Sequence, residues 1–497
     1  LEFFAAEDYD NALDMCNKAI KKDPEDQRLR LTTSTILTIR HSIDQNANHL
    51  EEALTHLKKA MTIDADSYEI NYRMGHVLML LEKDSARKFL EKSVSINPEH
   101  AEALNDLGLL ELKVDKAESQ NLFTRAIKAD PNFADAHNNL GNLFFQNGDY
   151  KSAVKHLNKA LEINPKQHNI HYNISEAFKK LGNSDAAIAH LRTALAIDPS
   201  NNPEMYHNLA LLFSAKGMFQ EAIDAYETAI LIRPDSYMLY IQLADYHTTQ
   251  RKDPAKARQV LQQALQNLPT NREIILTLAT QFRLADDWNG AITELNKLFA
   301  LNREDVDALV ELGYVYADQE RWREAESTFK KALEYNKKDA KLHRLIAAVL
   351  KAQNEFDPAE EYYKKAIKLD PKMVENYEGL GAMYSETQKY PPAIECFEKV
   401  LELSEVPYGE AHSHLGTLYH QEGNTQLAAF HIMRGIELNP DDWASHYNAH
   451  LFFEDINMPE ESAYHQKQAI RLNPTFFSDV ADHMSGQGQR RLPSNDM

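Results

Sequence analysis

DAHNNLGNLFFQNGDYKSAVKHLNKALEINP, residues 135–165, contains two short helical patterns and a stop signal. Leu140, Gly141 and Phe144 follow a histidine at spacings that put all four residues on one face of a helix. A Gly-Asp pair then interrupts the pattern. Three further residues, Ala153, Leu157 and Ala160, form a second stripe that ends at an Asn-Pro pair. The segment therefore predicts a helix–turn–helix unit with one apolar side.

The same unit recurs through the chain at intervals of about 34 residues. An apolar-small pair marks the first helix, as in Leu312-Gly313 and Leu380-Gly381, because only a small residue lets two helices approach closely. Repeats are predicted to begin near Gln27, Tyr68, Ala101, Ala134, His168, Pro203, Tyr237, Arg272, Val306, Ala340, Val374, Gly409 and Trp443. The repeat from Gln27 is too long, with an excess around residues 41–49 that suggests a polar loop or a longer helix pair.

This pattern resembles the tetratricopeptide repeat, whose signature is W-x2-L-G-x2-Y, A-x3-F and a closing Pro. Residues 135–165 depart from it mainly at His137, where the signature has Trp. The resemblance implies an all-α, right-handed superhelical α-solenoid of about thirteen repeats. We predict a partial repeat at 1–26, the array at 27–476, a capping helix at 477–484 and a flexible tail at 485–497.

Composition narrows the classes of partner. The 497 residues include 54 Lys and Arg against 75 Asp and Glu, a formal net charge of −21. A general nucleic-acid binder needs a basic face to replace phosphate counterions, so we predict no nucleic-acid partner. The excess of acidic residues also disfavours binding to an anionic membrane surface and favours basic or polar protein ligands.

No apolar run approaches the ~20 residues that span a bilayer, so we expect no direct membrane insertion and a cytoplasmic location. The two cysteines, Cys16 and Cys396, form no disulfide framework and no C-x-x-C motif. The chain starts at Leu1 within a repeat pattern, so a signal, an anchor or a whole domain could precede it.

The resemblance implies that first helices line a concave groove that binds protein or extended peptide. Asn139, Asn173 and Asn208 occupy one position in three consecutive repeats, and Asp106 and Gln242 continue the row. The row resembles the asparagine ladder in the superhelix of O-linked N-acetylglucosamine transferase, whose amides hold a peptide backbone. The alternative is that these amides are solvated or bond a neighbouring helix. Further candidate groove residues are Asn138, Asn142 and Tyr172.

Two other binding modes are disfavoured. The carboxylate clamp of chaperone-binding relatives needs Lys and Arg in positions where this chain has mostly Asn, Tyr, His and Glu. Acidic residues near the start of seven first helices predict a negative rim instead: Glu102, Asp135, Glu204, Glu273, Asp307, Glu375 and Glu410. A basic or polar ligand suits such a rim better than an acidic one.

Metal and catalytic sites are not indicated. His446 and His450 share a helix side, but zinc needs further convergent ligands and no Cys or H-E-x-x-H motif supplies them. His137, His171, His343, His412 and His446 occupy the Trp position of the signature and are interpreted as packing residues. No P-loop, G-x-S-x-G or strand-linked G-x-G-x-x-G occurs, so we predict no enzyme, no cofactor and no metal.

Three functions fit these observations. The favoured hypothesis is a protein–protein interaction scaffold that binds protein or extended peptide partners along its groove. The first alternative is a substrate-recruiting module of a larger, membrane-anchored or soluble enzyme such as a glycosyltransferase. The second is a structural subunit that assembles with other subunits of a large complex.

Overall fold

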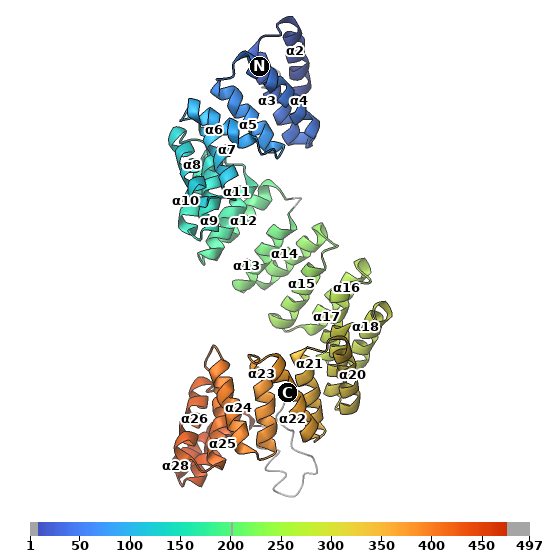
Figure 1. The fold of residues 1–497 in the computed structure, drawn as a ribbon. Helices are drawn as coiled ribbons and strands as arrows, with labels where there is room; N and C mark the ends of the chain where they lie inside the picture. Colours follow the sequence, from blue (N-terminus) through green and yellow to red (C-terminus); the bar gives the residue numbers. More distant parts are fainter. Residues whose placement is uncertain (1–7, 200–201, 475–497) are drawn as a thin grey trace. The chain divides into compact units, whose positions relative to one another are not determined.

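The computed structural model describes residues 8–199 and 202–474, which fold into α-helices without any β-strand (Figure 1). In chain order the helices are α2 (Tyr9–Lys22), α3 (Gln27–Asp44), α4 (Ala47–Ile63), α5 (Tyr68–Leu80), α6 (Ala86–Ile96), α7 (Ala101–Glu111), α8 (Lys116–Ala129), α9 (Ala134–Gln146), α10 (Tyr150–Ile163), α11 (His168–Lys180), α12 (Ser184–Ile197), α13 (Pro203–Ala215), α14 (Phe219–Ile232), α15 (Tyr237–Thr249), α16 (Pro254–Asn267), α17 (Arg272–Arg283), α18 (Trp288–Leu301), α19 (Val306–Asp318), α20 (Trp322–Tyr335), α21 (Ala340–Ala352), α22 (Phe356–Leu369), α23 (Val374–Glu386), α24 (Tyr390–Leu403), α25 (Gly409–Gln421), α26 (Thr425–Leu438), α27 (Trp443–Asp455) and α28 (Pro459–Leu472).

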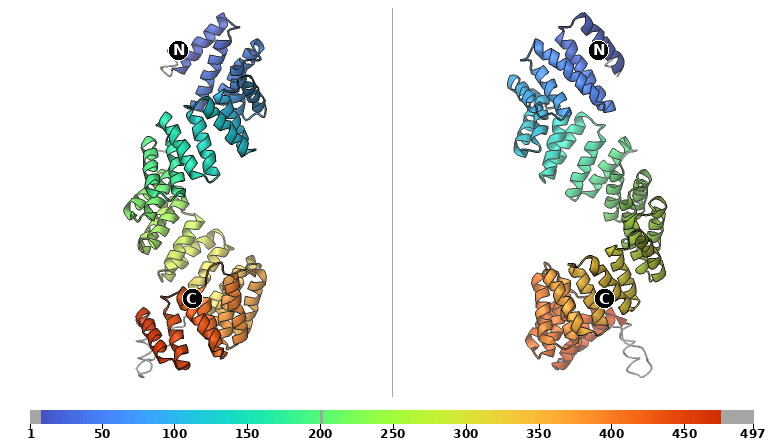
Figure 2. Two further views of the ribbon diagram at one scale, coloured as in Figure 1. Left: turned by 90° about the vertical axis from the view of Figure 1, so that its left-hand side faces the viewer. Right: turned by 45° about the vertical axis from the view of Figure 1, so that its right-hand side comes forward.

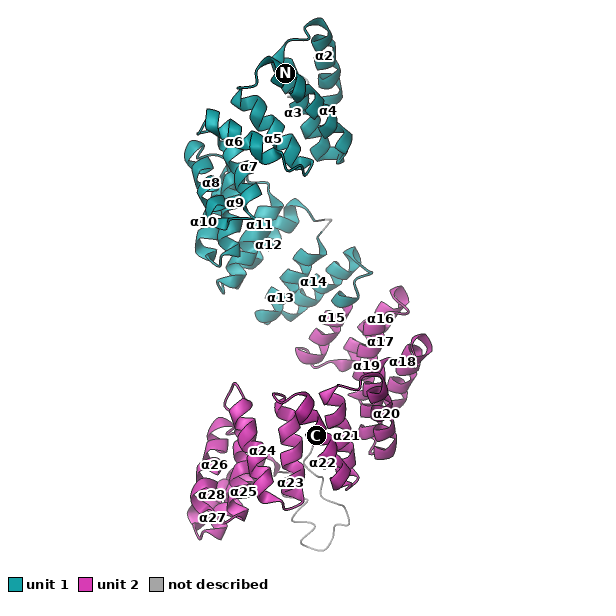
Figure 3. Cartoon of the chain, in the orientation of Figure 1, with its two compact units in different colours: residues 1–239 teal, residues 240–497 magenta. Residues whose placement is uncertain are grey.

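The chain divides into two compact units, residues 1–239 and residues 240–497, which are coloured separately in Figure 3. In unit 1 the pairs from α3/α4 to α13/α14 pack closely, and in unit 2 the pairs from α17/α18 to α27/α28 do the same. Within a unit, the second helix of a pair then packs against the first helix of the next pair. Figure 2 gives two further views of the helices. The predicted all-α repeat solenoid is confirmed.

Consecutive first helices also touch each other directly within a unit. These contacts join α3, α5, α7, α9 and α11 in unit 1, and they recur for α17/α19, α21/α23 and α25/α27 in unit 2. Among the described residues no comparable contact joins consecutive second helices. The stack is therefore tighter on the side of the first helices, which brings their side chains within reach of the next repeat.

The local sequence explains where a helix begins and ends, as α10 illustrates. The Asp149 side chain accepts a hydrogen bond from the backbone N–H of Ser152 and caps the helix start. Ala153 and Leu157 are buried against neighbouring helices. At the other end Asn164 leaves helical geometry (φ −131°, ψ 90°), as expected for a residue that precedes a proline.

In most repeats the turn between the two helices contains a residue with positive φ. Gly148 has φ +83°, whereas the same turn position holds Glu320 at φ 57° and Asn354 at φ 61°. A side chain in this left-handed region costs about 1 kcal/mol, which glycine avoids. The repeats with a non-glycine residue therefore carry some local strain.

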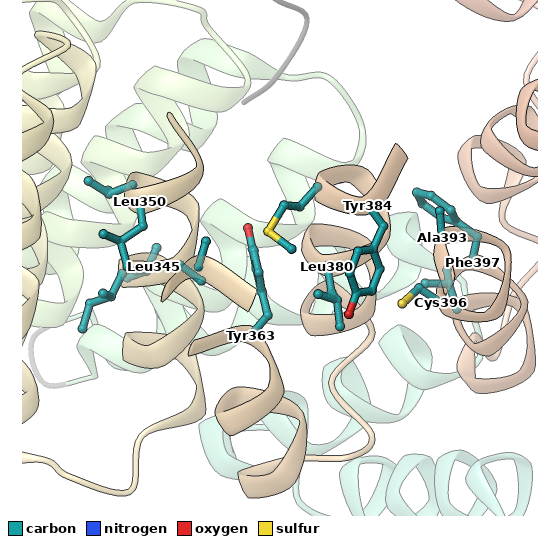
Figure 4. Close-up of a cluster of buried hydrophobic side chains, with 14 of the residues drawn as sticks. Leu345, Leu350, Tyr363, Leu380, Tyr384, Ala393, Cys396 and Phe397 are labelled. Carbon is teal, nitrogen blue, oxygen red and sulfur yellow. The ribbon is translucent and has the colours of Figure 1, made fainter. Parts of the chain in front are cut away.

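Small residues in first helices leave room for large side chains of second helices. A Cβ atom at Gly313 would lie 2.3 Å from Cε1 of Phe329, and one at Gly379 would lie 2.4 Å from Cε1 of Tyr363. One large buried cluster extends from α19 to α25, and Figure 4 shows Tyr363, Leu380 and Phe397 within it. Gly379 is thus a packing residue.

The excess predicted around residues 41–49 lies largely in longer helices. Helix α3 has 18 residues and α4 has 17, and only Gln45 and Asn46 separate them. The predicted capping helix at 477–484 and tail at 485–497 fall outside the described residues, as do residues 1–7 of the predicted partial repeat. None of the described helices combines the length and the apolar character needed to cross a lipid bilayer.

Candidate peptide-binding face

The first-helix face of unit 1 is the side of α7, α9, α11 and α13 that carries the predicted groove residues. Asn138, Asn139, Asn142, Tyr172, Asn173 and Asn208 are all half-buried there, and Asp106 is buried. Each lies in the middle of a first helix, where the helix backbone is fully hydrogen-bonded. These parts of the helices therefore offer polar side chains and no free backbone groups.

Each residue of the predicted row in unit 1 reaches back to the preceding repeat. Nδ2 of Asn139 donates to Oδ1 of Asn105 at 2.8 Å. Nδ2 of Asn173 donates to Oδ1 of Asn142 at 2.9 Å. The row therefore forms hydrogen bonds between repeats. For at least one hydrogen of each amide, this is the alternative in which the side chain bonds a neighbouring helix.

The same relationship extends to both ends of the row in unit 1. Nδ2 of Asn208 donates to the hydroxyl of Tyr172 at 3.1 Å. At the other end Oδ2 of Asp106 lies 2.7 Å from Nδ1 of His76 in α5. Burial, reinforced by the charge of Glu176, raises the pKa of Tyr172, so this hydroxyl stays protonated at neutral pH.

Asn138 and Asn142 form a second, weaker link within α9. Nδ2 of Asn142 donates to Oδ1 of Asn138 at 3.4 Å, while Oδ1 of Asn142 accepts from Asn173. One side of the face therefore carries a continuous amide chain from Asn138 to Asn173. Sequence reasoning missed Asn105, although it occupies the same helix position as Asn138 and could have been found by aligning the repeats.

Gln242 belongs to unit 2, where it is half-buried in α15. Its side-chain oxygen is buried and has no hydrogen-bond partner among the described residues. In the same unit Glu311, which interrupts the amide row in sequence, accepts from Nε of Arg283 in the preceding repeat at 2.7 Å. An ion pair therefore replaces the amide link in this repeat.

The acidic rim is partly neutralised. Arg233 pairs with Glu204 at 2.6 Å, and Arg272 contacts Glu273, Asp305 and Asp307. Three of the seven predicted rim acids are therefore paired with arginine. Asp135, Glu375 and Glu410 are exposed and have no ion pair in the described part of the chain.

The histidines do not converge on a metal. His446 contacts His465 and His450 contacts Ser462, so the two rings that share a side of α27 have separate partners. In residues 8–199 and 202–474 no group of three or more potential ligands is close enough to hold an ion. Four histidines at the Trp position of the repeat each pair with a second histidine, a feature that the sequence interpretation missed.

Family models identify the repeat. A tetratricopeptide-repeat model matches residues 134–167, and two related models match residues 176–217 and 409–442. The chain belongs to the tetratricopeptide-repeat superfamily. Its members are typically non-catalytic scaffolds for protein interaction, and the repeats and the fold support this general role here.

A further model covers the middle of the tetratricopeptide array. Residues 200–403 are similar to the C-terminal domain of cilia and flagella-associated protein 70. No curated protein sequence matches the chain.

Several solved structures are similar in architecture. YrrB, described as a TPR protein with an unusual peptide-binding site, has 20% identity and a TM-score of 0.33, covering 37% of this chain and 94% of its own. The APC/C hetero-tetramer Cut9-Hcn1 has 13% identity and a TM-score of 0.41, with 90% and 94% covered. The Naa15/Naa10 complex bound to HypK-THB has 13% identity and a TM-score of 0.37, with 98% and 96% covered.

Proposed function

We propose that the chain is an interaction scaffold whose first-helix face between α7 and α13 binds an extended, polar segment of a partner protein. The observation that carries this proposal is the row of half-buried amides on consecutive repeats. An amide side chain has two N–H donors and an oxygen with two acceptor positions. Asn139 and Asn173 each use one donor in their recorded bonds to the preceding repeat, which leaves an acceptor and a second donor for a ligand.

A peptide backbone offers the complementary groups. Each residue of an extended peptide presents one N–H and one C=O, whatever its side chain is. The inter-repeat bonds hold the amides of Asn139 and Asn173 in fixed orientations before a ligand arrives. Less side-chain entropy is then lost on binding, which raises the affinity obtained from each new hydrogen bond.

The charge of the face sets the class of peptide. Glu102 and Asp135 are exposed near the starts of α7 and α9, and the whole chain has a net charge of −21. Lys179, the basic residue beside Asn208, forms an ion pair with Glu176 at 2.7 Å. A polar or basic segment is therefore favoured, because an acidic one would be repelled during the approach.

Affinity capture with matched variants tests the proposal. The purified chain is used as bait in a cell extract, and bound proteins are compared with those captured by the N139A/N173A/N208A variant. The control is N121A/K155A/T193A, which alters exposed positions of the second helices α8, α10 and α12. Proteins that the control retains and the asparagine variant loses support the proposal, and identical captured sets for all three baits would refute it.

A second candidate is a subunit of a cilia- or flagella-associated assembly. The support is the similarity of residues 200–403 to the C-terminal domain of cilia and flagella-associated protein 70. The tagged chain would then co-fractionate with axonemes after detergent extraction of ciliated cells. Complete release into the detergent-soluble fraction would count against this candidate. The alternative of a substrate-recruiting module of a larger enzyme stays a prediction.

A further inference from the structure

Four repeats contain a pair of histidines that face each other between the first and the second helix. The separation between the two Nδ1 atoms is 3.2 Å, 3.1 Å, 2.9 Å and 2.9 Å along the chain. The pairs are His137/His156, His171/His190, His412/His431 and His446/His465. The same contact therefore joins the first and second helix in two adjacent repeats of unit 1 and in two adjacent repeats of unit 2.

The contact made by Nε2 of the first-helix histidine determines which nitrogen atoms of a pair carry hydrogen. Nε2 of His137 lies 3.3 Å from the carbonyl oxygen of Pro131, and Nε2 of His446 lies 3.1 Å from that of Pro440. A carbonyl only accepts, so Nε2 carries the hydrogen and Nδ1 of the same neutral ring is an acceptor. The second-helix histidine must then donate from its own Nδ1, and each pair shares one hydrogen between its two Nδ1 atoms.

A second proton, beyond the one shared, would be unfavourable for a pair. On the acceptor Nδ1 it would make two hydrogens point at each other across about 3 Å, and the hydrogen bond would be replaced by repulsion. On Nε2 of the second-helix ring it would keep the hydrogen bond but place a charge on a ring whose burial disfavours that charge. An aromatic ring covers the second-helix imidazole in every pair, which limits access of water. These rings are Phe144, Phe178, Tyr419 and Phe453, at centroid distances of 5.5 Å, 5.7 Å, 5.5 Å and 5.5 Å.

Few charged groups act on the pairs. Lys155 and Lys159 oppose protonation of the first pair and Glu162 weakly favours it, while Arg434 opposes and Glu398 favours protonation of the third. Among the described residues, only the partner histidine acts electrostatically on His190 and on His465. Burial, followed by the partner histidine, lowers the pKa of His431 and of His465 to about 4.

We propose that the four histidine pairs make their repeats acid-labile, so that the first and second helices separate when a pair takes up a second proton. The sites are α9/α10 and α11/α12 in unit 1, and α25/α26 and α27/α28 in unit 2. Because α9 and α11 also carry Asn139 and Asn173, opening in unit 1 would distort the candidate peptide-binding face. The acid lability itself does not depend on that face having a ligand.

The direction follows from proton linkage. A histidine whose pKa is lowered by folding binds more protons in the opened state, so opening becomes more favourable as the pH falls below the ordinary value. For one histidine of ordinary pKa ~6.5 that stays neutral when folded, the opening equilibrium rises about eightfold from about pH 7 to about pH 5.5.

Amide hydrogen exchange with mass spectrometry on the full chain tests the proposal. After correction for the intrinsic effect of pH, exchange in α9–α12 and α25–α28 should accelerate at least about eightfold from about pH 7 to about pH 5.5. The repeat α19/α20 has no histidine and should change much less. Equal changes in all repeats, or no change in the paired ones, would overturn the proposal.

Variants separate the pairs from other acid effects. Tyr362 occupies the second-helix position opposite His343, with ring centroids 5.9 Å apart, so tyrosine fits this position in the same fold. H156Y/H190Y should remove the acid-induced exchange in α9–α12 and leave that in α25–α28, whereas H168Y should leave both. If the variants do not fold, nitrogen-15 NMR of the wild-type imidazoles decides: titration of the paired rings near ~6.5 would overturn the proposal.

Discussion

Asn139 in α9 donates its side-chain N–H to Oδ1 of Asn105 in α7 at 2.8 Å and thereby joins two consecutive repeats. Asp106, Asn173 and Asn208 make equivalent contacts with the repeat before their own. One helix position therefore supplies the link between repeats along the first-helix face of unit 1. The same residues stabilise the stack and form the candidate binding surface.

This double role predicts unequal effects of two alanine substitutions. Asn105 is 5% exposed, so N139A leaves its buried Oδ1 without a donor and should lower the free energy of unfolding by about 1–2 kcal/mol. N105A should cost less, about 0.5–1 kcal/mol, because water can replace the lost partner of the half-buried Asn139 amide. Urea unfolding followed by circular dichroism measures both, and the exposed N132A is the control. Equal costs for N139A and N132A would show that the link has no energetic weight.

The Gly313–Phe329 contact predicts a compensating pair of substitutions. G313A puts a Cβ 2.3 Å from the Phe329 ring and should destabilise the chain by about 1–3 kcal/mol. Ala279 and Leu295 occupy the same two positions in the preceding repeat, and both are fully buried there. G313A/F329L should therefore be more stable than G313A alone. Thermal unfolding of the wild type, G313A, F329L and G313A/F329L gives the coupling energy between the two positions. Strictly additive effects would contradict the packing argument.

The contacts of Arg272 predict that neighbouring acids differ in importance. Asp305 is 5% exposed, accepts two hydrogen bonds from Arg272 at 2.7 Å and 2.8 Å, and caps α19 through the N–H of Ala308. D305A should cost about 1–2 kcal/mol, since it removes a helix cap and leaves the arginine with fewer partners. D307A should cost under about 0.5 kcal/mol, because the Asp307 side chain is 67% exposed and solvent screens the ion pair. Denaturant midpoints compare the two, and a larger loss for D307A would reverse this assignment.

The histidine pairs also predict the pH dependence of global stability. The pKa of His431 and of His465 is about 4 in the folded chain, below the ordinary value of ~6.5. The contribution of these two histidines to folding stability is complete above their ordinary pKa and is lost as the pH falls toward their pKa in the folded chain. The melting temperature should therefore decrease from about pH 7 to about pH 5. H431Y/H465Y should flatten this decrease, whereas a slope unchanged from wild type would indicate that other groups cause it. Differential scanning fluorimetry across this pH range measures the slope.

The sequence was sufficient for the fold class and the superfamily because both depend on local spacing. Leu140 and Gly141 recur at helical intervals, and the Pro after Asn164 fixes a helix end through sterics of adjacent residues. The partners of the amides were not predictable in the same way. Whether Asn139 meets a ligand, water or Asn105 depends on the distance between two helices in different repeats. That distance is set by packing of many side chains.

The histidine pairs had a sequence signal that single-repeat reasoning did not use. His137 and His156 are 19 residues apart, and the spacing is the same for the pairs that begin at His171, His412 and His446. Each first-helix histidine was interpreted alone as a packing residue. The second partner becomes visible only when the two helices of a repeat are aligned across the array.

Titration calorimetry with a peptide from a captured partner tests whether the amide row binds peptide. We expect N139A/N173A/N208A to bind the peptide at least about tenfold more weakly than the wild type, a loss of about 1.4 kcal/mol. The control S413A removes a hydrogen bond between repeats of unit 2, that between Ser413 and Ser445, and should bind as the wild type does. Unchanged affinity of the folded triple variant would contradict the assignment of the amide row as the binding face.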